Sequence, residues 1–411
     1  MTSRDTTAAG ASLRLDNALI FDGHSAELRE GSILVRDGVI LQVGEVDASA
    51  DRIIDARGGV AVPGLIDAHF HAYGTSLDLL ELQSSTLSYV ALSAANRLRG
   101  ALQRGFTTVR DVAGGDAGLA KALREGLLLG PRYLYTGAAL SQTGGHGDSH
   151  PGDRNLCAHG GDHVTEVVDG VEALRKVVRK RFRSGAHAIK ILASGGVVSP
   201  TDPLRNPQYS ADEIAAVTDE ARRRGSYVAA HAYSCEAVVH AVTNGVRTIE
   251  HGNLLDRPTA DLMREHDAFL VPTLAAYDAM DRRGAELGMA EVSRRKNREV
   301  LESGKHAIEI ARAAGVQIGF GTDLMGALED EQLEGLRLQS EADGILNTLR
   351  SATSVNAAII GRDDLGVIRV GAQGDVVLFA GNPFEDASLL WDRHSDRTIV
   401  QAGSVVAGPY T

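Results

Sequence analysis

The stretch that decides the fold is "HAIKILASGG", His187 to Gly196. Ile189, Ile191 and Leu192 have the apolar character of a buried strand, yet Lys190 stands among them. A bare ammonium in an apolar strand is costly unless it is paired, neutralised or chemically modified. The reason for this lysine must therefore lie in the residues that surround it in the folded chain.

Seven other short apolar segments accompany this one, and helical stretches separate most of them. Residues 169–185 and 210–225 are examples of such helical stretches, and the second opens with Ser210 and Glu213 in the spacing of a capping box. Alternating strands and helices imply a parallel sheet with crossover helices, and eight such units predict a closed (β/α)8 TIM barrel. An open, doubly wound sheet is the alternative, although no GxGxxG loop or P-loop is present. The eight segments are "VAVPGLIDAH" (60–69), "TTVRDVAG" (107–114), "RYLYTGAALS" (132–141), "HAIKILAS" (187–194), "SYVAAHA" (226–232), "RTIEHG" (247–252), "FLVPTLAA" (269–276) and "VQIGFGTD" (316–323).

Both ends of the chain have a different pattern, in which apolar and polar residues alternate and glycine or aspartate marks the turns. Residues 12–55 have it, and so do 366–381 and 397–408. This period of two is typical of antiparallel strands. We therefore expect a small β-sandwich domain built from residues 1–62 and 362–411, and a barrel domain at 63–361.

The composition narrows the class of protein. The 411 residues are 43% hydrophobic and 23% charged, which suits a soluble globular chain. The formal net charge is −12, from 42 Lys and Arg against 54 Asp and Glu, so a nucleic-acid partner is not expected. No apolar run approaches the roughly 18 residues that span a membrane, and the N-terminus does not resemble a signal peptide. A cytoplasmic enzyme without a membrane partner is the expectation.

Polar residues stand where the predicted barrel strands end. His69 and His71 are two apart, so on an extended strand both face the same side. His231, His251 and Asp323 end the fifth, sixth and eighth segments. Singly, each fits a hydrogen-bonded strand-end residue, but barrel strands bring their carboxyl ends to one mouth. Histidine and aspartate together suit Zn²⁺ and related divalent ions.

A metal site at this mouth gives Lys190 a role. Reaction with CO2 would convert the amine into a carbamate, which is an anion with one oxygen for each of two metal ions. The alternatives are a Schiff-base lysine, as in barrel aldolases, and a plain ion pair. A Schiff-base lysine has no need of four histidines around the same mouth.

At these residues the chain resembles the amidohydrolase superfamily, in its binuclear form with a carboxylated lysine. The resemblance covers nearly the whole chain and includes "VPGLIDAHFH", Lys190, His231, His251, "GTD" and the closing "RSATSVNAAIIGRDDLGVIRVGAQGDVVLF". Within the superfamily, "TGGHGD", "KILASGGVVSP", "AAHAYS" and "IEHGN" are most similar to the imidazolonepropionase-like branch. That branch holds metal-dependent Xaa-Pro dipeptidases and ochratoxin-type amidases.

The resemblance implies two divalent metal ions, zinc by preference, bridged by a carbamate on Lys190. A hydroxide between the metals would attack the substrate carbonyl. Asp323 would accept its proton and pass it to the leaving amine. The implied ligands of the first metal are His69, His71 and Asp323, and those of the second are His231 and His251.

Two further residues are candidates for substrate contact. His146, in "QTGGHGD", resembles a family residue that touches the substrate carbonyl or carboxylate, and it also fits a solvated loop histidine. Tyr233 faces the same side as His231 and would donate to the tetrahedral intermediate, or else pack at the barrel rim. Arg110 and Asp111 are expected to form a structural pair.

The remaining histidines of interest are expected to be non-ligands. The Gly- and His-rich segment 150–163 is predicted to be a mobile lid. The histidines set aside are His150, His159, His163 and His187.

The predicted function is hydrolysis of an amide or peptide bond to an L-amino acid leaving group, as a dipeptidase or carboxypeptidase does. Xaa-Pro dipeptides, N-acyl amino acids and ochratoxin A are the expected small-molecule substrates, because the metals leave a positive field that attracts a free carboxylate. Hydrolysis of a cyclic amide is the nearest alternative. Deamination, a Schiff-base aldolase and a scaffold without metals are more distant ones. Related enzymes imply a homo-oligomer.

Overall fold

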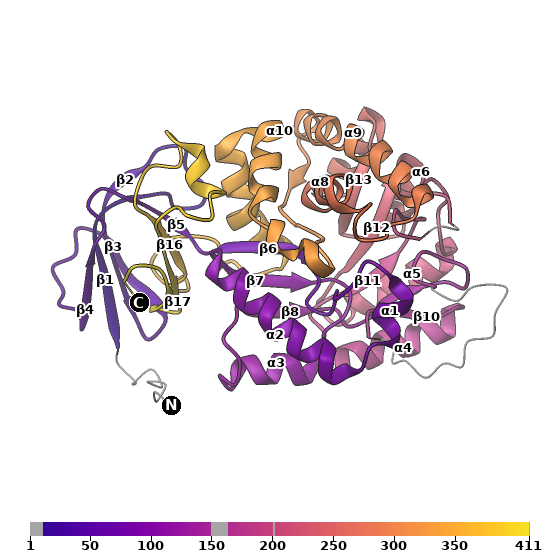
Figure 1. The fold of residues 1–411 in the computed structure, drawn as a ribbon, viewed down its shortest axis with the longest axis horizontal. Helices are drawn as coiled ribbons and strands as arrows, with labels where there is room; N and C mark the ends of the chain where they lie inside the picture. Colours follow the sequence, from indigo (N-terminus) through magenta and orange to yellow (C-terminus); the bar gives the residue numbers. More distant parts are fainter. Residues whose placement is uncertain (1–10, 149–162, 200–201, 411) are drawn as a thin grey trace.

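The structure is a computed structural model that describes residues 11–148, 163–199 and 202–410. Of the predicted lid, only His163 falls within these ranges, so the lid stays a prediction, and His150 and His159 lie outside them. The chain forms a small β domain at one end of the molecule and a barrel at the other (Figure 1).

The small β domain joins the two ends of the chain in one hydrogen-bonded sheet of eight strands. Its order is β18-β17-β16-β5-β1-β2-β3, with β4 paired to β1. Along β1 the buried positions alternate with partly exposed ones, and its inward residues join those of β2 and β16 in an apolar core. The domain boundaries at 62/63 and 361/362 stay a prediction. The strands are β1 (Ser12–Ile20), β2 (Arg29–Arg36), β3 (Val39–Gly44), β4 (Arg52–Asp55), β5 (Val60–Pro63), β16 (Val376–Phe379), β17 (Arg397–Gln401) and β18 (Ser404–Ala407).

All eight apolar segments expected in the barrel supply its strands. The first segment divides in two, because residues 60–63 form β5, which pairs with β16, and residues 65–70 form the barrel strand β6. The strands form a parallel set of three, β6-β7-β8, and a parallel set of seven, β10-β9-β11-β12-β13-β14-β15. They are β6 (Leu65–Phe70), β7 (Phe106–Asp111), β8 (Arg132–Tyr135), β9 (Ala139–Ser141), β10 (Thr165–Val167), β11 (Ile189–Leu192), β12 (Val228–Ser234), β13 (Thr248–Leu254), β14 (Phe269–Val271) and β15 (Gln317–Ile318).

Backbone hydrogen bonds join the two sets of strands and close the barrel. The amide of Ala68 donates to the carbonyl of Phe320 at 2.9 Å, which links β6 to the segment after β15. On the other side, the amide of His187 donates to the carbonyl of Tyr135 at 2.8 Å. The prediction of a (β/α)8 barrel is therefore confirmed, and the open sheet is excluded.

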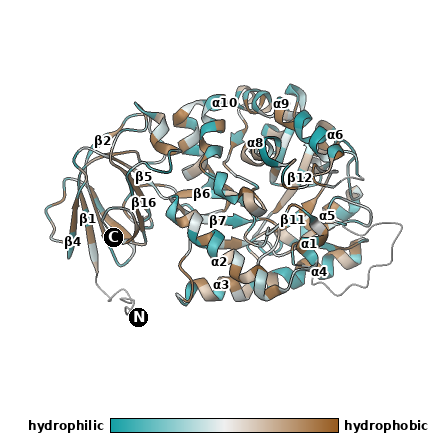
Figure 2. Cartoon of the chain, in the orientation of Figure 1, coloured by the Kyte–Doolittle hydropathy of each residue, from teal (hydrophilic) through white to brown (hydrophobic). Residues whose placement is uncertain are grey.

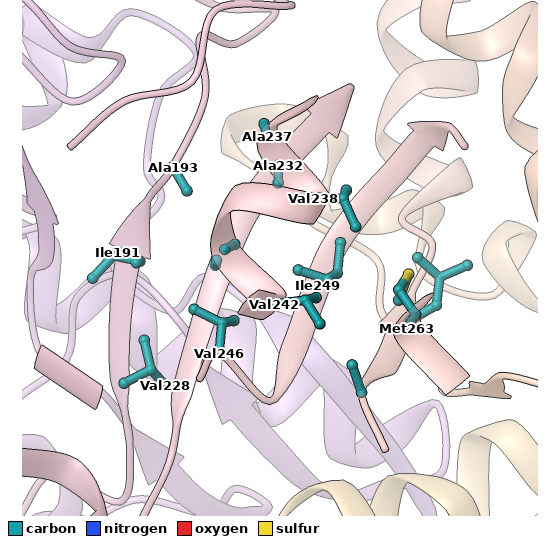
Figure 3. Packing of buried hydrophobic residues seen from close by; sticks show 14 of the residues in the cluster. Ile191, Ala193, Val228, Ala232, Ala237, Val238, Val242, Val246, Ile249 and Met263 are labelled. Carbon is teal, nitrogen blue, oxygen red and sulfur yellow. The ribbon is translucent and has the colours of Figure 1, made fainter. Parts of the chain in front are cut away.

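Helices cover the outside of the barrel. The capping box predicted at Ser210 and Glu213 is present at the start of α5. Ile191, Val228 and Ile249 point outward from their strands and pack against helix residues such as Val242 (Figure 3). Most helices show one apolar and one polar face (Figure 2), and none within the described ranges has the length and apolar composition of a transmembrane span. The α-helices are α1 (Leu79–Ser84), α2 (Leu87–Gln103), α3 (Ala117–Arg124), α4 (Val171–Arg183), α5 (Ala211–Arg222), α6 (Cys235–Thr243), α7 (Arg257–Glu265), α8 (Leu274–Arg283), α9 (Glu291–Ala314), α10 (Glu334–Arg350) and α11 (Asn356–Ile359).

Three short irregular helices complete the chain: η1 (Gly326–Glu331), η2 (Ser351–Val355) and η3 (Ala387–Leu390).

The alternation of side chains along β11 explains how an apolar strand can contain a lysine. Since neighbouring residues on a strand face opposite sides, Ile189 and Ile191 enter the outer core and Lys190 faces the barrel interior. The fold therefore directs this one charged residue toward the mouth of the barrel.

Candidate metal centre

One cavity at the carboxyl end of the barrel collects the side chains that the sequence singled out. They come from β6, β11, β12, β13, the segment after β15 and the loop after β9. Apolar side chains such as Leu77, Val197 and Met280 form much of the remaining wall. The predicted site residues that line the cavity are His69, His71, His146, Lys190, His231, Tyr233, His251 and Asp323.

His69, His71 and Asp323 form the tightest group. One potential ligand atom from each lies within 4.8 Å of the others. The Asp323 Oδ1 atom is 2.8 Å from His71 Nε2 and 3.3 Å from His69 Nε2. Gly321 permits this approach, because a Cβ there would lie 2.5 Å from the Cβ of His69.

The proton positions in this group fit a bound cation. His69 Nδ1 is 2.8 Å from Glu250 Oε2, a contact that requires a proton on Nδ1 because a carboxylate only accepts. With the proton on Nδ1, the Nε2 atom of His69 faces Asp323 Oδ1. His71 Nε2 faces the same oxygen, whereas its buried Nδ1 has no hydrogen-bond partner among the described residues. A divalent cation between these atoms would satisfy the facing lone pairs.

His231 and His251 form the second group, with ring centroids 4.5 Å apart. Burial and the neighbouring His251 hold the pKa of His231 well below its ordinary value. Burial likewise lowers the pKa of His251, although the charge of Asp323 opposes this. Both imidazoles are therefore neutral, which is the form that binds metal ions.

The backbone at two of these residues takes up a conformation that side chains rarely adopt. His251 has φ +80° and Asp323 has φ +56°. The break in strand geometry at His251 lets its side chain and that of Glu250 both reach the barrel interior, although neighbours on a regular strand face opposite sides. Such positions cost roughly 1–3 kcal/mol each and cluster at functional sites.

Lys190 is buried in the same cavity, with 3% of its surface exposed. Burial lowers the pKa of Lys190 to about 8, although the charges of Glu250 and Asp323 oppose this. A substantial fraction of the amine is therefore neutral near pH 8. The neutral amine is the form that can react with CO2.

His146 and Tyr233 lie beside the two groups of histidines. The His146 ring stacks on His231 with a centroid distance of 4.5 Å, and a Cβ on Gly196 would overlap it at 2.1 Å. His146 is buried, so the alternative of a solvated loop histidine is wrong. Tyr233 stacks on His251, and its hydroxyl is 2.9 Å from that of Tyr277. Its contact with substrate stays a prediction.

The expected pair of Arg110 and Asp111 is wrong, since neighbouring residues of a strand point to opposite sides. The Arg110 guanidinium donates to Glu250 Oε1 at 2.8 Å, whereas Asp111 accepts from Tyr133 and from backbone amides. Glu250 is not among the site residues predicted from the sequence, although it is a charged residue in an apolar strand, as Lys190 is. Tyr277 on α8 was missed as well, because nothing in its local sequence marks it.

The histidines set aside as non-ligands fall elsewhere or outside the described ranges. His187 precedes β11, at the opposite end of the barrel, and its ring contacts Tyr227. His163 lies within the described ranges and does not line the cavity, although the adjacent Val164 does.

Comparisons with known proteins agree with this geometry. A model of the amidohydrolase family matches residues 60–406. An ochratoxinase from Aspergillus niger is 31% identical over 418 residues, which cover 95% of this chain and 86% of that protein.

Two solved structures are also similar. A prolidase complexed with N-methylphosphonate-L-proline is 42% identical with a TM-score of 0.93, covering 97% of this chain and 100% of the other. A Xaa-Pro dipeptidase with bound methionine is 29% identical with a TM-score of 0.86, covering 97% and 100%. On this evidence the chain is a hydrolase and belongs to the amidohydrolase family.

Proposed function

We propose that this protein is a binuclear, metal-dependent amidohydrolase that releases an L-amino acid from an amide or peptide bond. The observation that carries the proposal is the convergence of four buried imidazoles, Lys190 and Asp323 on one cavity. His69, His71 and Asp323 would hold one cation, and the remaining two imidazoles would hold the other. When bound, the two ions would polarise the scissile carbonyl and lower the pKa of water.

In this proposal the carboxylate of Asp323 would carry a proton. Burial alone would raise its pKa, but the nearby imidazoles, His69 foremost, offset this and hold it well below the ordinary value. Asp323 is therefore ionised and can accept a proton from the attacking water. It then delivers this proton to the departing nitrogen, which leaves as an amine.

Lys190 would serve as a carbamate that bridges the two metal ions. Its amine reaches the cavity from β11, which pairs with β12, the strand that carries His231. Carbamylation removes the ammonium that makes a buried lysine costly and supplies two oxygen ligands. It thereby explains a lysine in the middle of an apolar strand.

The proposed substrates carry a free carboxylate on the leaving half, as Xaa-Pro dipeptides and N-acyl amino acids do. The charges of two divalent cations exceed those of the carbamate and Asp323, so the pocket would attract an anion. His146 and Tyr233 line the cavity and would contact this carboxylate, beside an apolar wall that suits an apolar acyl group. Similarity to the ochratoxinase makes ochratoxin A a specific candidate.

A matched pair of substrates tests this proposal. An N-acyl L-amino acid and its C-terminal carboxamide differ only in the carboxylate. We expect kcat/KM to favour the acid by at least about tenfold, roughly 1.4 kcal/mol. Equal rates would reject the carboxylate contact, and a preference for cyclic amides would reject the substrate class.

A further inference from the structure

A chain of buried polar contacts runs behind His69, on the side away from Asp323. The His69 Nδ1 atom lies 2.8 Å from Glu250 Oε2, and the other oxygen of this carboxylate accepts from Arg110 at 2.8 Å. The side chains of Arg110 and Glu250 are completely buried, and that of His69 is 1% exposed. Solvent therefore does not screen these contacts.

Additional hydrogen bonds fix both members of the ion pair. The Arg110 Nε donates to the carbonyl of Ala68, next to His69, at 2.5 Å, and another of its nitrogens donates to Thr248 at 3.2 Å. The hydroxyl of Thr248 in turn donates to Glu250 Oε1 at 2.6 Å. The carboxylate thus has both oxygens occupied, so its orientation toward His69 is determined.

Among the described residues, the two imidazoles of the second group, His231 and His251, are hydrogen-bonded to neutral partners and to no carboxylate. His251 Nδ1 lies 2.7 Å from the hydroxyls of both Thr273 and Tyr277, which are neutral groups. His231 Nε2 faces the carbonyl of Gly195 at 3.2 Å. An anionic acceptor makes an imidazole a more basic ligand than a neutral acceptor does. The two groups of histidines therefore differ in their hydrogen-bond partners, because His69 contacts an anion whereas His231 and His251 contact neutral groups.

We propose that Glu250, held by Arg110, is a positioning residue that fixes the tautomer and orientation of His69 and makes the site of His69, His71 and Asp323 the tighter of the two metal sites. This inference rests on the proposed function, because it requires a metal ion at that site. With its proton on Nδ1, His69 presents the Nε2 lone pair toward the other two ligands. Neither Glu250 nor Arg110 lines the substrate cavity.

The test is a titration of the metal-free, full-length protein with Zn²⁺ in competition with a chromophoric chelator. The wild-type protein should show a tighter and a weaker step. In Glu250→Gln the tighter step should weaken by roughly 10- to 100-fold, the usual effect of removing the hydrogen-bond partner of a metal-binding histidine. Tyr277→Phe is the matched control, since it removes one neutral hydroxyl from His251. It should leave the tighter step unchanged.

A double variant separates positioning from stability. Glu250→Gln alone leaves the Arg110 charge buried without its anion and should lower the unfolding temperature. In Arg110→Met/Glu250→Gln no charge is buried alone, so the unfolding temperature should recover while Zn²⁺ binding stays weak. If affinity recovers together with the unfolding temperature, Glu250 has only a structural role and the inference is wrong.

The outcome for the wild-type protein distinguishes this inference from the proposed function. If the wild-type protein binds no Zn²⁺, the metal centre itself is rejected. If the wild-type protein binds tightly and Glu250→Gln binds equally tightly, the metal centre stands and only the role of Glu250 is rejected.

Discussion

The mouth of the barrel and the core of the small β domain are opposite in chemistry. The β-domain core consists of apolar side chains such as Leu15, Ile33 and Val376. The barrel mouth instead gathers a buried lysine, several buried histidines and Asp323, whose side chain is 17% exposed. Burial of apolar surface stabilises the folded chain, whereas burial of ionisable groups costs free energy unless each group has a partner. The comparison teaches that the mouth is organised for chemistry and depends on the surrounding structure for its stability.

The largest expected effect is the loss of activity in Lys190→Ala. Without the bridging carbamate, kcat/KM should fall by at least about a thousandfold, on the order of 4 kcal/mol. The unfolding temperature measured without metal should not fall in parallel, because the variant removes a desolvated amine. Short carboxylic acids should restore part of the rate by occupying the place of the carbamate. A metal-loaded, active crystal with an unmodified Lys190 would contradict the proposal.

Asp323→Asn should have the next largest effect. The amide keeps the shape of the side chain but cannot accept a proton, so kcat should fall by about a hundredfold or more. Circular dichroism and thermal unfolding would show whether the fold is retained. Near-normal turnover in this variant would assign the proton transfer to another group.

A buried arginine offers a way to weaken the barrel mouth without replacing a proposed ligand. Arg97 on α2 donates to the carbonyls of His71, Leu324 and Gly326, and burial lowers its pKa to about 10. Arg97→Met leaves these acceptors without their donor and should reduce the free energy of unfolding by about 2 kcal/mol. Chemical denaturation measures this loss.

The control for that variant lies two residues away on the same helix. Arg99 is exposed and donates to Asn96 at 2.8 Å. Arg99→Met should change the free energy of unfolding by less than about 0.5 kcal/mol. If the two variants lose equal free energies of unfolding, the three carbonyl contacts of Arg97 do not contribute to stability.

The smallest effect is expected in the β domain. Ile33→Val removes one methylene from a fully buried site and should cost about 1 kcal/mol of unfolding free energy. The kcat/KM value should stay unchanged, because Ile33 packs in the β-domain core, which contains none of the proposed ligands. Ile53→Val, at a site that is 52% exposed, should have no measurable effect on either quantity. A change in kcat/KM for Ile33→Val would show that the two regions are coupled.

Much of the fold follows from local patterns in the sequence. The period-two ends, the strand–helix alternation and the capping box at Ser210 each depend on residues within a few positions of one another. The polar residues at strand ends are also local features, and barrel geometry requires them to meet at one mouth. This explains why His69, His231 and Asp323, which are far apart in the sequence, line one cavity in the structure.

The sequence by itself determined the barrel, the small β domain and the polar strand-end residues that meet at the mouth. Only the tertiary structure decided their partners. Arg110 pairs with Glu250, 140 residues away, and not with the adjacent Asp111, because contact across the barrel depends on which way each strand faces. The positive φ of His251 turns two consecutive side chains inward, which no periodic pattern would indicate. Local patterns specify elements, whereas the pairing of buried charges depends on long-range packing that brings distant residues within hydrogen-bond distance.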